Sequence, residues 1–128
     1  EPKYLVLDEP TAGLDPYGRE DLLKRIFRLH REKKMTVIFV SHNMDDIARL
    51  ADRVVVMHEG TVLLDAAPKE AFEAEAALQR AGLDTPRTVT LLKKLQKCGL
   101  SIRADAFTVE EAVKRIGRAW RERREKRC

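Results

Sequence analysis

Apolar residues in the first forty positions form two short uninterrupted runs with a helically spaced stretch between them. The runs are residues 4–7 (YLVL) and residues 36–40 (TVIFV), and the apolar positions between them are 22, 23, 26, 27 and 29. Continuous apolar runs are typical of strands buried in a parallel sheet. Spacing by three and four residues predicts a helix with one apolar face. The opening therefore predicts a β-α-β unit with two parallel strands.

Local signals mark where these elements begin and where a hairpin follows. Asp15 before Pro16 predicts a helix start, with the Asp side chain as N-cap and the proline at the first helical position. A short helix is predicted over residues 44–50. The apolar run at residues 53–57, a Glu59-Gly60 turn and a returning run at residues 61–64 predict a β-hairpin.

After residue 67 the pattern becomes helical and strongly charged. Pro68 predicts a helix that ends at Gly82, and Thr85-Pro86 opens another that ends at residues 98–99. A capping box, Thr108-x-x-Glu111, precedes a third helix. We therefore predict an α/β domain over residues 1–66 and a helical C-terminal extension over residues 67–128.

The composition is that of an ordinary globular chain with a charged surface. Its 128 residues suffice for one domain, or for a small core with an appendage. Most of the net charge of +4 comes from residues 121–127, where five basic residues accompany two acidic ones. A terminal run of mixed sign is typical of a solvated helix end, so we expect no nucleic-acid partner.

Two other classes of protein find no support in the sequence. No apolar run approaches the roughly 20 residues that cross a bilayer, and the opening residues do not have the pattern of a secretory signal.

Cys98 and Cys128 lie far apart and show no metal-ligand spacing. We therefore expect reduced thiols in the cytoplasm.

Polar residues that can bind ligands or take part in catalysis follow each of the two predicted parallel strands. Asp8 and Glu9 end the first strand, and Ser41-His42 follow the second. The carboxyl ends of such strands meet at one edge of the sheet, where ligands bind. An oxygen ligand such as Asp8 suits the magnesium of a nucleotide, and Glu9 is placed to polarise the water that attacks a terminal phosphate. Pro10 disfavours a helical conformation at Glu9, which predicts an extended backbone there.

Three segments in order resemble motifs of the ATP-binding-cassette (ABC) ATPases. Residues 4–10 (YLVLDEP) resemble the Walker B segment, residues 11–15 (TAGLD) the D-loop, and residues 41–43 (SHN) the H-loop. The resemblance implies part of a P-loop NTPase core that uses ATP and Mg²⁺.

The same resemblance implies a role for four residues. Asp8 would serve the magnesium through water, and Glu9 would be the catalytic base. Asp15 would lie at the nucleotide-bearing interface and couple two ATPase subunits. His42 would contact the γ-phosphate.

Two other motifs of this family are absent from the sequence. No G-x-x-x-x-G-K-[ST] phosphate loop occurs, since Gly13 and Gly18 are followed by Arg19-Glu20. No Leu-Ser-Gly-Gly-Gln signature occurs either. We therefore expect the C-terminal part of an ATPase subunit, inactive by itself.

The later residues resemble a particular branch of the family. Residues 82–86 (GLDTP), 91–95 (LLKKL) and 108–112 (TVEEA) resemble the C-terminal region of the energy-coupling-factor, or cobalt-type, ATPases. The resemblance implies an importer of vitamins or of cobalt and nickel ions, at the cytoplasmic face of the membrane. Its partners would be a second ATPase subunit, identical or homologous, and a transmembrane subunit.

Two alternatives stay open at this point. The chain could belong to an ABC ATPase that serves DNA repair or translation, although no coiled-coil arm or second cassette is visible. It could instead be a non-catalytic module in which residues 68–120 mediate assembly. The transported solute cannot be read from the sequence.

Overall fold

A computed structural model describes residues 2–125, so Cys128 and the end of the basic tail lie outside the described residues. The chain divides into two compact units, Glu1–Leu50 and Ala51–Cys128, which we call the N-terminal and C-terminal units. The domain division predicted after residue 66 falls within the C-terminal unit and stays a prediction. Within residues 2–125, no helix has both the length and the apolar character required to cross a bilayer.

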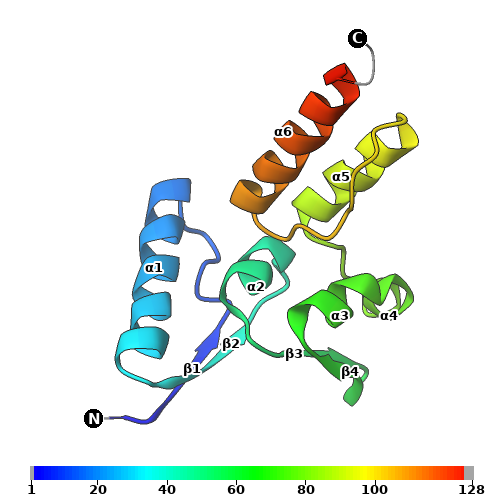
Figure 1. The fold of residues 1–128 in the computed structure, drawn as a ribbon. Coiled ribbons are helices and arrows are strands. Elements are labelled where there is room, and N and C mark those ends of the chain that lie inside the picture. Colours follow the sequence, from blue (N-terminus) through cyan, green and yellow to red (C-terminus); the bar gives the residue numbers. More distant parts are fainter. Residues whose placement is uncertain (1, 126–128) are drawn as a thin grey trace. The chain divides into compact units, whose positions relative to one another are not determined.

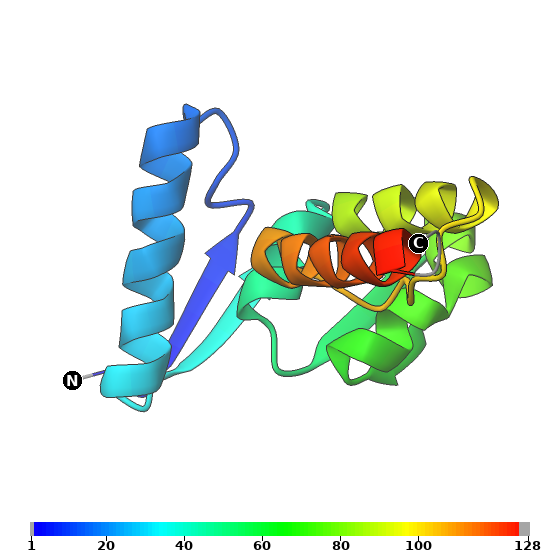
Figure 2. The same cartoon turned by 45° about the horizontal axis from the view of Figure 1, so that its top comes forward.

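The N-terminal unit is the predicted β-α-β arrangement followed by a short helix. Its elements are β1 (Tyr4–Asp8), α1 (Pro16–Glu32), β2 (Thr36–Val40) and α2 (Met44–Leu50). β1 and β2 pair in parallel, with Tyr4 opposite Thr36 and Asp8 opposite Val40. α1 lies alongside the two strands (Figures 1 and 2). The predicted parallel pair is confirmed.

Only one face of the β1–β2 pair is covered. Alternate side chains of both strands are half-buried, and Leu23 and Ile26 of α1 are buried at 2% and 4% exposure. The opposite face is apolar and exposed. It carries Tyr4, Val6, Ile38 and Val40. The apolar runs predicted buried strands, and in this structure that is correct for one face alone.

The start of α1 agrees with the sequence signal. Asp15 has an extended backbone, and its Oδ1 accepts a hydrogen bond of 2.8 Å from the backbone N–H of Gly18. Pro16 occupies the first helical position, where a missing N–H costs nothing. The predicted N-cap is confirmed.

Two ion pairs, each with two hydrogen bonds, join α1 to α2. Arg19 pairs with Asp46, at 2.6 Å between NH2 and Oδ1. Glu20 pairs with Arg49, whose NH1 and NH2 lie 2.7 and 3.0 Å from the two carboxylate oxygens. The hydrogen bond from Arg49 lowers the pKa of Glu20 from 4.5 to about 2.

This shift makes a small part of the stability dependent on pH. A carboxyl group whose pKa is lower in the folded state stabilises the fold above its unfolded pKa and loses that effect as the pH falls. We expect the melting temperature of the chain to exceed that of a Glu20→Gln variant at pH 6, and the difference to vanish between pH 4.5 and about 2. The difference should be small because the pair is on the surface. A difference in melting temperature that stays constant over this range would contradict the assignment.

The C-terminal unit begins with the predicted hairpin. β3 (Val54–His58) and β4 (Thr61–Ala66) pair antiparallel, with His58 opposite Thr61. Glu59 and Gly60 form the two-residue turn with φ of 48° and 75°, as a type I′ turn requires. The predicted turn is confirmed.

Four helices follow the hairpin: α3 (Pro68–Glu73), α4 (Glu75–Arg80), α5 (Arg87–Lys97) and α6 (Val109–Glu125). The single helix predicted from Pro68 to Gly82 is wrong, because the chain breaks at Ala74, where ψ is 59°. Phe72 and Leu78 are both about 1% exposed. In a continuous helix they would lie about 120° apart around the axis. The break lets both side chains be buried.

α5 and α6 lie side by side around a small core (Figures 1 and 2). Leu92 of α5 is fully buried with Ala106 and with Ala112 of α6. Half-buried apolar side chains surround these three: Leu95, Ile102, Ala104 and Ile116. One side of each of these two helices therefore packs in the core.

The capping box that opens α6 is confirmed, with one difference. The backbone N–H of Glu111 donates to Thr108 Oγ1 at 3.3 Å, as predicted. The Glu111 carboxylate accepts at 3.0 Å from the N–H of Phe107, one residue before the expected donor.

Candidate active site

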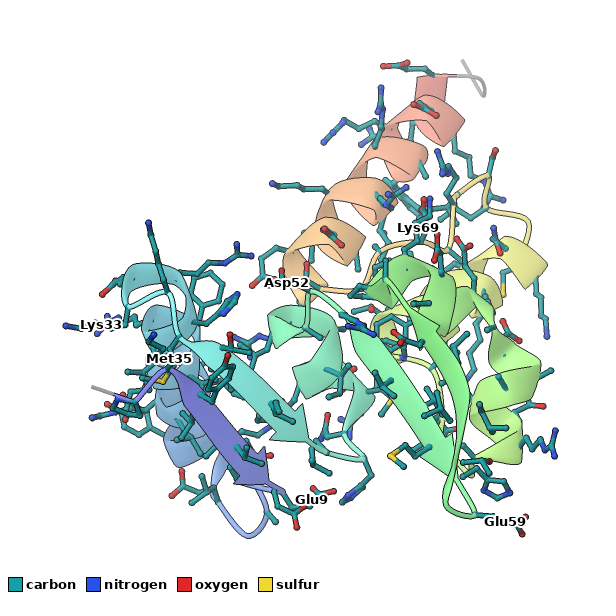
Figure 3. The ribbon with its side chains drawn as sticks, turned by 90° about the horizontal axis from the view of Figure 1, so that it is seen from below. Glu9, Lys33, Met35, Asp52, Glu59 and Lys69 are labelled. Carbon is teal, nitrogen blue, oxygen red and sulfur yellow. The ribbon has the colours of Figure 1, made fainter. Side chains whose placement is uncertain are left out.

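Glu9 and His42, taken from the ends of two different strands, meet at the carboxyl edge of the β1–β2 pair. Glu9 Oε1 accepts from the backbone N–H of His42 at 3.0 Å and lies 2.7 Å from His42 Nδ1. Figure 3 shows Glu9 at the arrowhead end of β1. A carboxylate oxygen can only accept, so Nδ1 carries the hydrogen of this contact. Oε2 of Glu9 and Nε2 of His42 are thus left for other partners.

The backbone of Glu9 departs from the extended conformation that we predicted. Its N–H still donates to Val40 O at 2.8 Å, which extends the strand pairing by one bond. Its φ, however, is 44°, in the left-handed region that L-residues other than Asn and Asp rarely adopt. Pro10 does exclude the right-handed helical region, but the prediction of an extended Glu9 is wrong. Conformations of this kind cost about 1–3 kcal/mol and cluster at functional sites.

The loop from Glu9 to Asp15 is built from successive tight turns. The N–H of Ala12 donates to Glu9 O at 3.0 Å, and the N–H of Leu14 donates to Thr11 O at 3.3 Å. Gly13 supplies a φ of 74° between them. The loop is therefore compact, with Glu9 at one end and the helix cap Asp15 at the other.

A buried carboxylate fixes the middle of this loop. Thr11 Oγ1 donates to Asp46 Oδ2 at 3.0 Å. Arg19 donates to Oδ1 of the same residue from Nε at 3.0 Å and from NH2 at 2.6 Å. The side chain of Asp46 is 1% exposed. Each of its oxygens has a partner, as a buried charge requires.

The segment that carries His42 is also ordered by side-chain caps. Asn43 Oδ1 accepts from the N–H groups of Asp45 and Asp46 at 3.1 and 3.2 Å. Asn43 therefore acts as N-cap of α2 and sets the first turn of the helix directly after His42.

The four residues singled out in the sequence are not all brought together. Glu9 and His42 touch, and Asp8 precedes Glu9 as the exposed last residue of β1. Asp15 lies at the far end of the loop, where its carboxylate caps α1. Its predicted role between two ATPase subunits stays a prediction.

Sequence reasoning missed Asp46 and Arg19. An aspartate in the first turn of a helix is common on a protein surface, because it favours the positive end of the helix dipole. What distinguishes Asp46 from a solvated aspartate is its ion pair with Arg19. Arg19 lies 27 residues earlier in the sequence, and only the fold brings the two side chains together.

At this edge of the sheet, Asp8 offers an exposed carboxylate to a magnesium ion. The described residues contain no group of three or more His, Cys, Asp or Glu side chains arranged to hold a metal. Mg²⁺ is commonly bound by one or two carboxylates together with substrate phosphates and water. The position of Asp8 fits such an ion when it arrives with a nucleotide.

Comparison with known proteins identifies relatives of this chain. The chain is 48% identical over 112 residues to the energy-coupling factor transporter ATP-binding protein EcfA2 of Clostridium perfringens. The matched segment covers 88% of this chain and 39% of the relative. The chain is also 47% identical over 117 residues to EcfA2 of Geobacillus kaustophilus, covering 91% of this chain and 40% of the relative. No protein-family model matches. The chain thus spans about 40% of the length of these relatives.

A solved structure agrees with the sequence relatives. The fold matches CbiO1 of Clostridium perfringens, described as part of the ABC transporter complex CbiONQ, with a TM-score of 0.53 and 39% identity. The match covers 72% of this chain and 37% of that one. The predicted α/β fold of the P-loop NTPase type is confirmed. The chain is therefore similar to ABC-type ATP-binding proteins, and energy-coupling factor ATP-binding proteins are among its relatives at 40–48% identity.

Proposed function

We propose that this chain is the water-activating, C-terminal part of an ATP-hydrolysing subunit that powers an ABC-type importer. The contact between Glu9 and His42 is the observation that carries the proposal. Two N–H groups of His42 hold Oε1 of Glu9 in a fixed position. The second oxygen, Oε2, can then accept a proton from the water that attacks the γ-phosphate.

His42 would serve the same reaction from the phosphate side. Its side chain is 79% exposed while Nδ1 remains bound to Glu9. Nε2 can donate to a phosphate oxygen when it also carries a hydrogen. A ring that touches both the base and the phosphate would link the position of the water-activating group to the position of the γ-phosphate.

Asp8 would hold magnesium through water, beside the nucleotide. When bound, the ion would neutralise charge that develops on the phosphate oxygens. The contribution of the chain is to keep Asp8 at the end of β1, one residue before the base.

The grip on the phosphates would come from outside this sequence, which contains no phosphate loop. We call the longer protein that contains both parts the complete subunit. The chain alone should therefore bind Mg-ATP with a dissociation constant above about 1 mM. This limit corresponds to a favourable binding free energy of roughly 4 kcal/mol. Calorimetric titration of the chain measures this constant. Micromolar binding would mean that some other segment of this chain grips the phosphates.

The importer assignment is supported by the relatives, which are energy-coupling factor transporter ATP-binding proteins. A subunit of this kind would act at the cytoplasmic face of the membrane with a second ATPase subunit and a transmembrane subunit. Its cargo would be a vitamin, or cobalt or nickel ions. Co-purification of a hydrophobic membrane subunit with the complete subunit would separate this role from DNA repair or translation.

The test of the catalytic proposal is ATP turnover by the complete subunit and its loss when Glu9 is changed to glutamine.

One observation favours a second, non-catalytic function for the C-terminal unit. α6 exposes Val109, Val113 and Trp120 at 66%, 62% and 57% along one side of the helix. If Glu9→Gln left both turnover and assembly unchanged, an assembly role would be the better description.

A further inference from the structure

We propose that Asp46 is a positioning residue for ATP hydrolysis, which holds the Glu9–Asp15 loop in fixed register with His42. The inference rests on the proposed function, since it assigns Asp46 a role toward the base and its histidine partner. Asp46 touches neither Glu9 nor His42 in any described contact. It would act through Thr11 and through the helix that follows His42.

The geometry forms two cross-links between the same two segments. The first joins Glu9 to His42, at 2.7 Å between Oε1 and Nδ1. The second joins Thr11 to Asp46, at 3.0 Å between Oγ1 and Oδ2. Thr11 follows Glu9 by two residues, and Asp46 follows His42 by four. Two points of attachment fix both the separation and the orientation of the segments, whereas one would leave a hinge.

The second cross-link is difficult to shift because its acceptor is buried and held from another side. Arg19 fixes Oδ1 of Asp46 with two hydrogen bonds, so the carboxylate cannot rotate away from Thr11 without losing them. The side chain of Asp46 is 1% exposed, and Thr11 is 9% exposed. Water is therefore a poor substitute for the Thr11 hydroxyl at this place.

The role is more specific than joining two helices. Glu20 and Arg49 already join α1 to α2 through a bidentate pair of their own. That pair is exposed and does not include Thr11. Asp46, by contrast, receives a hydrogen bond from the loop itself. The two pairs therefore allow helix attachment and loop positioning to be tested separately.

The test measures kcat and KM for ATP in the complete subunit with its transporter partners. Thr11→Val keeps the shape of the side chain and removes the hydroxyl. We expect kcat to fall about tenfold or more, because small displacements of a catalytic group have effects of this order, with KM within about threefold of the wild-type value. Thr11→Ser restores the hydroxyl and should return kcat to within about threefold. Glu20→Gln is the matched control and should leave kcat unchanged.

A second readout does not depend on turnover. Hydrogen exchange over residues 9–16 should be faster in Thr11→Val, since the amides of Ala12 and Leu14 close the turns of this loop. Glu20→Gln should leave this exchange unchanged.

The outcomes separate the inference from the proposed function. If Glu9→Gln loses turnover while Thr11→Val retains the wild-type kcat, the positioning role is overturned and the proposed base stands. If Glu20→Gln lowers kcat as much as Thr11→Val, Asp46 only joins helices and the inference is wrong. If Glu9→Gln retains turnover, the proposed function fails, and the positioning role fails with it.

Discussion

A Glu9→Gln variant of the complete subunit is expected to lose about 10²–10⁴-fold in ATP turnover while it still binds ATP. Glutamine has nearly the same shape, and its carbonyl oxygen can accept the two hydrogen bonds that His42 gives to Oε1. An amide cannot take up a proton from the attacking water, however. Phosphate release under saturating ATP measures the loss, and a separate nucleotide-binding assay measures what is retained.

Glu59→Gln is a matched control for this experiment. Glu59 also has a left-handed backbone, with φ of 48° against 44° for Glu9, but it lies in the hairpin turn of the C-terminal unit and is exposed. The same chemical change in a similar backbone conformation should leave turnover unaltered. Turnover within about twofold of wild type in Glu9→Gln would show that the base has been assigned wrongly.

A Leu92→Ala change is expected to destabilise the C-terminal unit by about 2–5 kcal/mol. Leu92 is fully buried, and the two other buried residues of its core, Ala106 and Ala112, have small side chains. Neither alanine can expand into the space that a missing leucine side chain leaves. The result should therefore lie toward the upper part of the range. Urea unfolding of the chain, followed by circular dichroism, measures the change in the free energy of unfolding.

The adjacent residue provides the comparison. Leu91 occupies the same helix, one position earlier, and is 47% exposed. Leu91→Ala should cost less than about 1 kcal/mol, because surface changes away from special features have small effects. Equal losses of stability in the two variants would mean that the face of α5 that packs in the core has been assigned wrongly.

The parts of the fold that the sequence predicted are those with local signals. Asp15 and Pro16 identify a helix start because the cap and the fixed φ act within one turn. Glu59-Gly60 identifies a hairpin turn because few residues tolerate a positive φ. Glu9 and His42 were placed at one edge because parallel strands bring their carboxyl ends together. Each of these inferences needs only residues near in sequence or a single topological rule.

The parts that failed depend on contacts between distant residues. Alanine is the best helix former, so nothing local predicts a break at Ala74. The left-handed backbone of Glu9 accompanies a hydrogen bond between its side chain and His42, 33 positions away. Burial of Asp46 depends on Arg19 and Thr11, which only the folded chain brings together. In each case tertiary contacts outweigh the local preference.

The backbone of Glu9 also has a consequence for evolution and for protein engineering. A glycine would adopt a φ of 44° with little strain, so at this position the residue most favourable for the backbone lacks the carboxylate. Retaining the glutamate costs the fold about 1 kcal/mol or more. With Glu9 as the proposed base, selection for heat resistance and selection for turnover favour different residues at position 9. A library of this protein screened for thermal tolerance alone would enrich variants that lack this carboxylate.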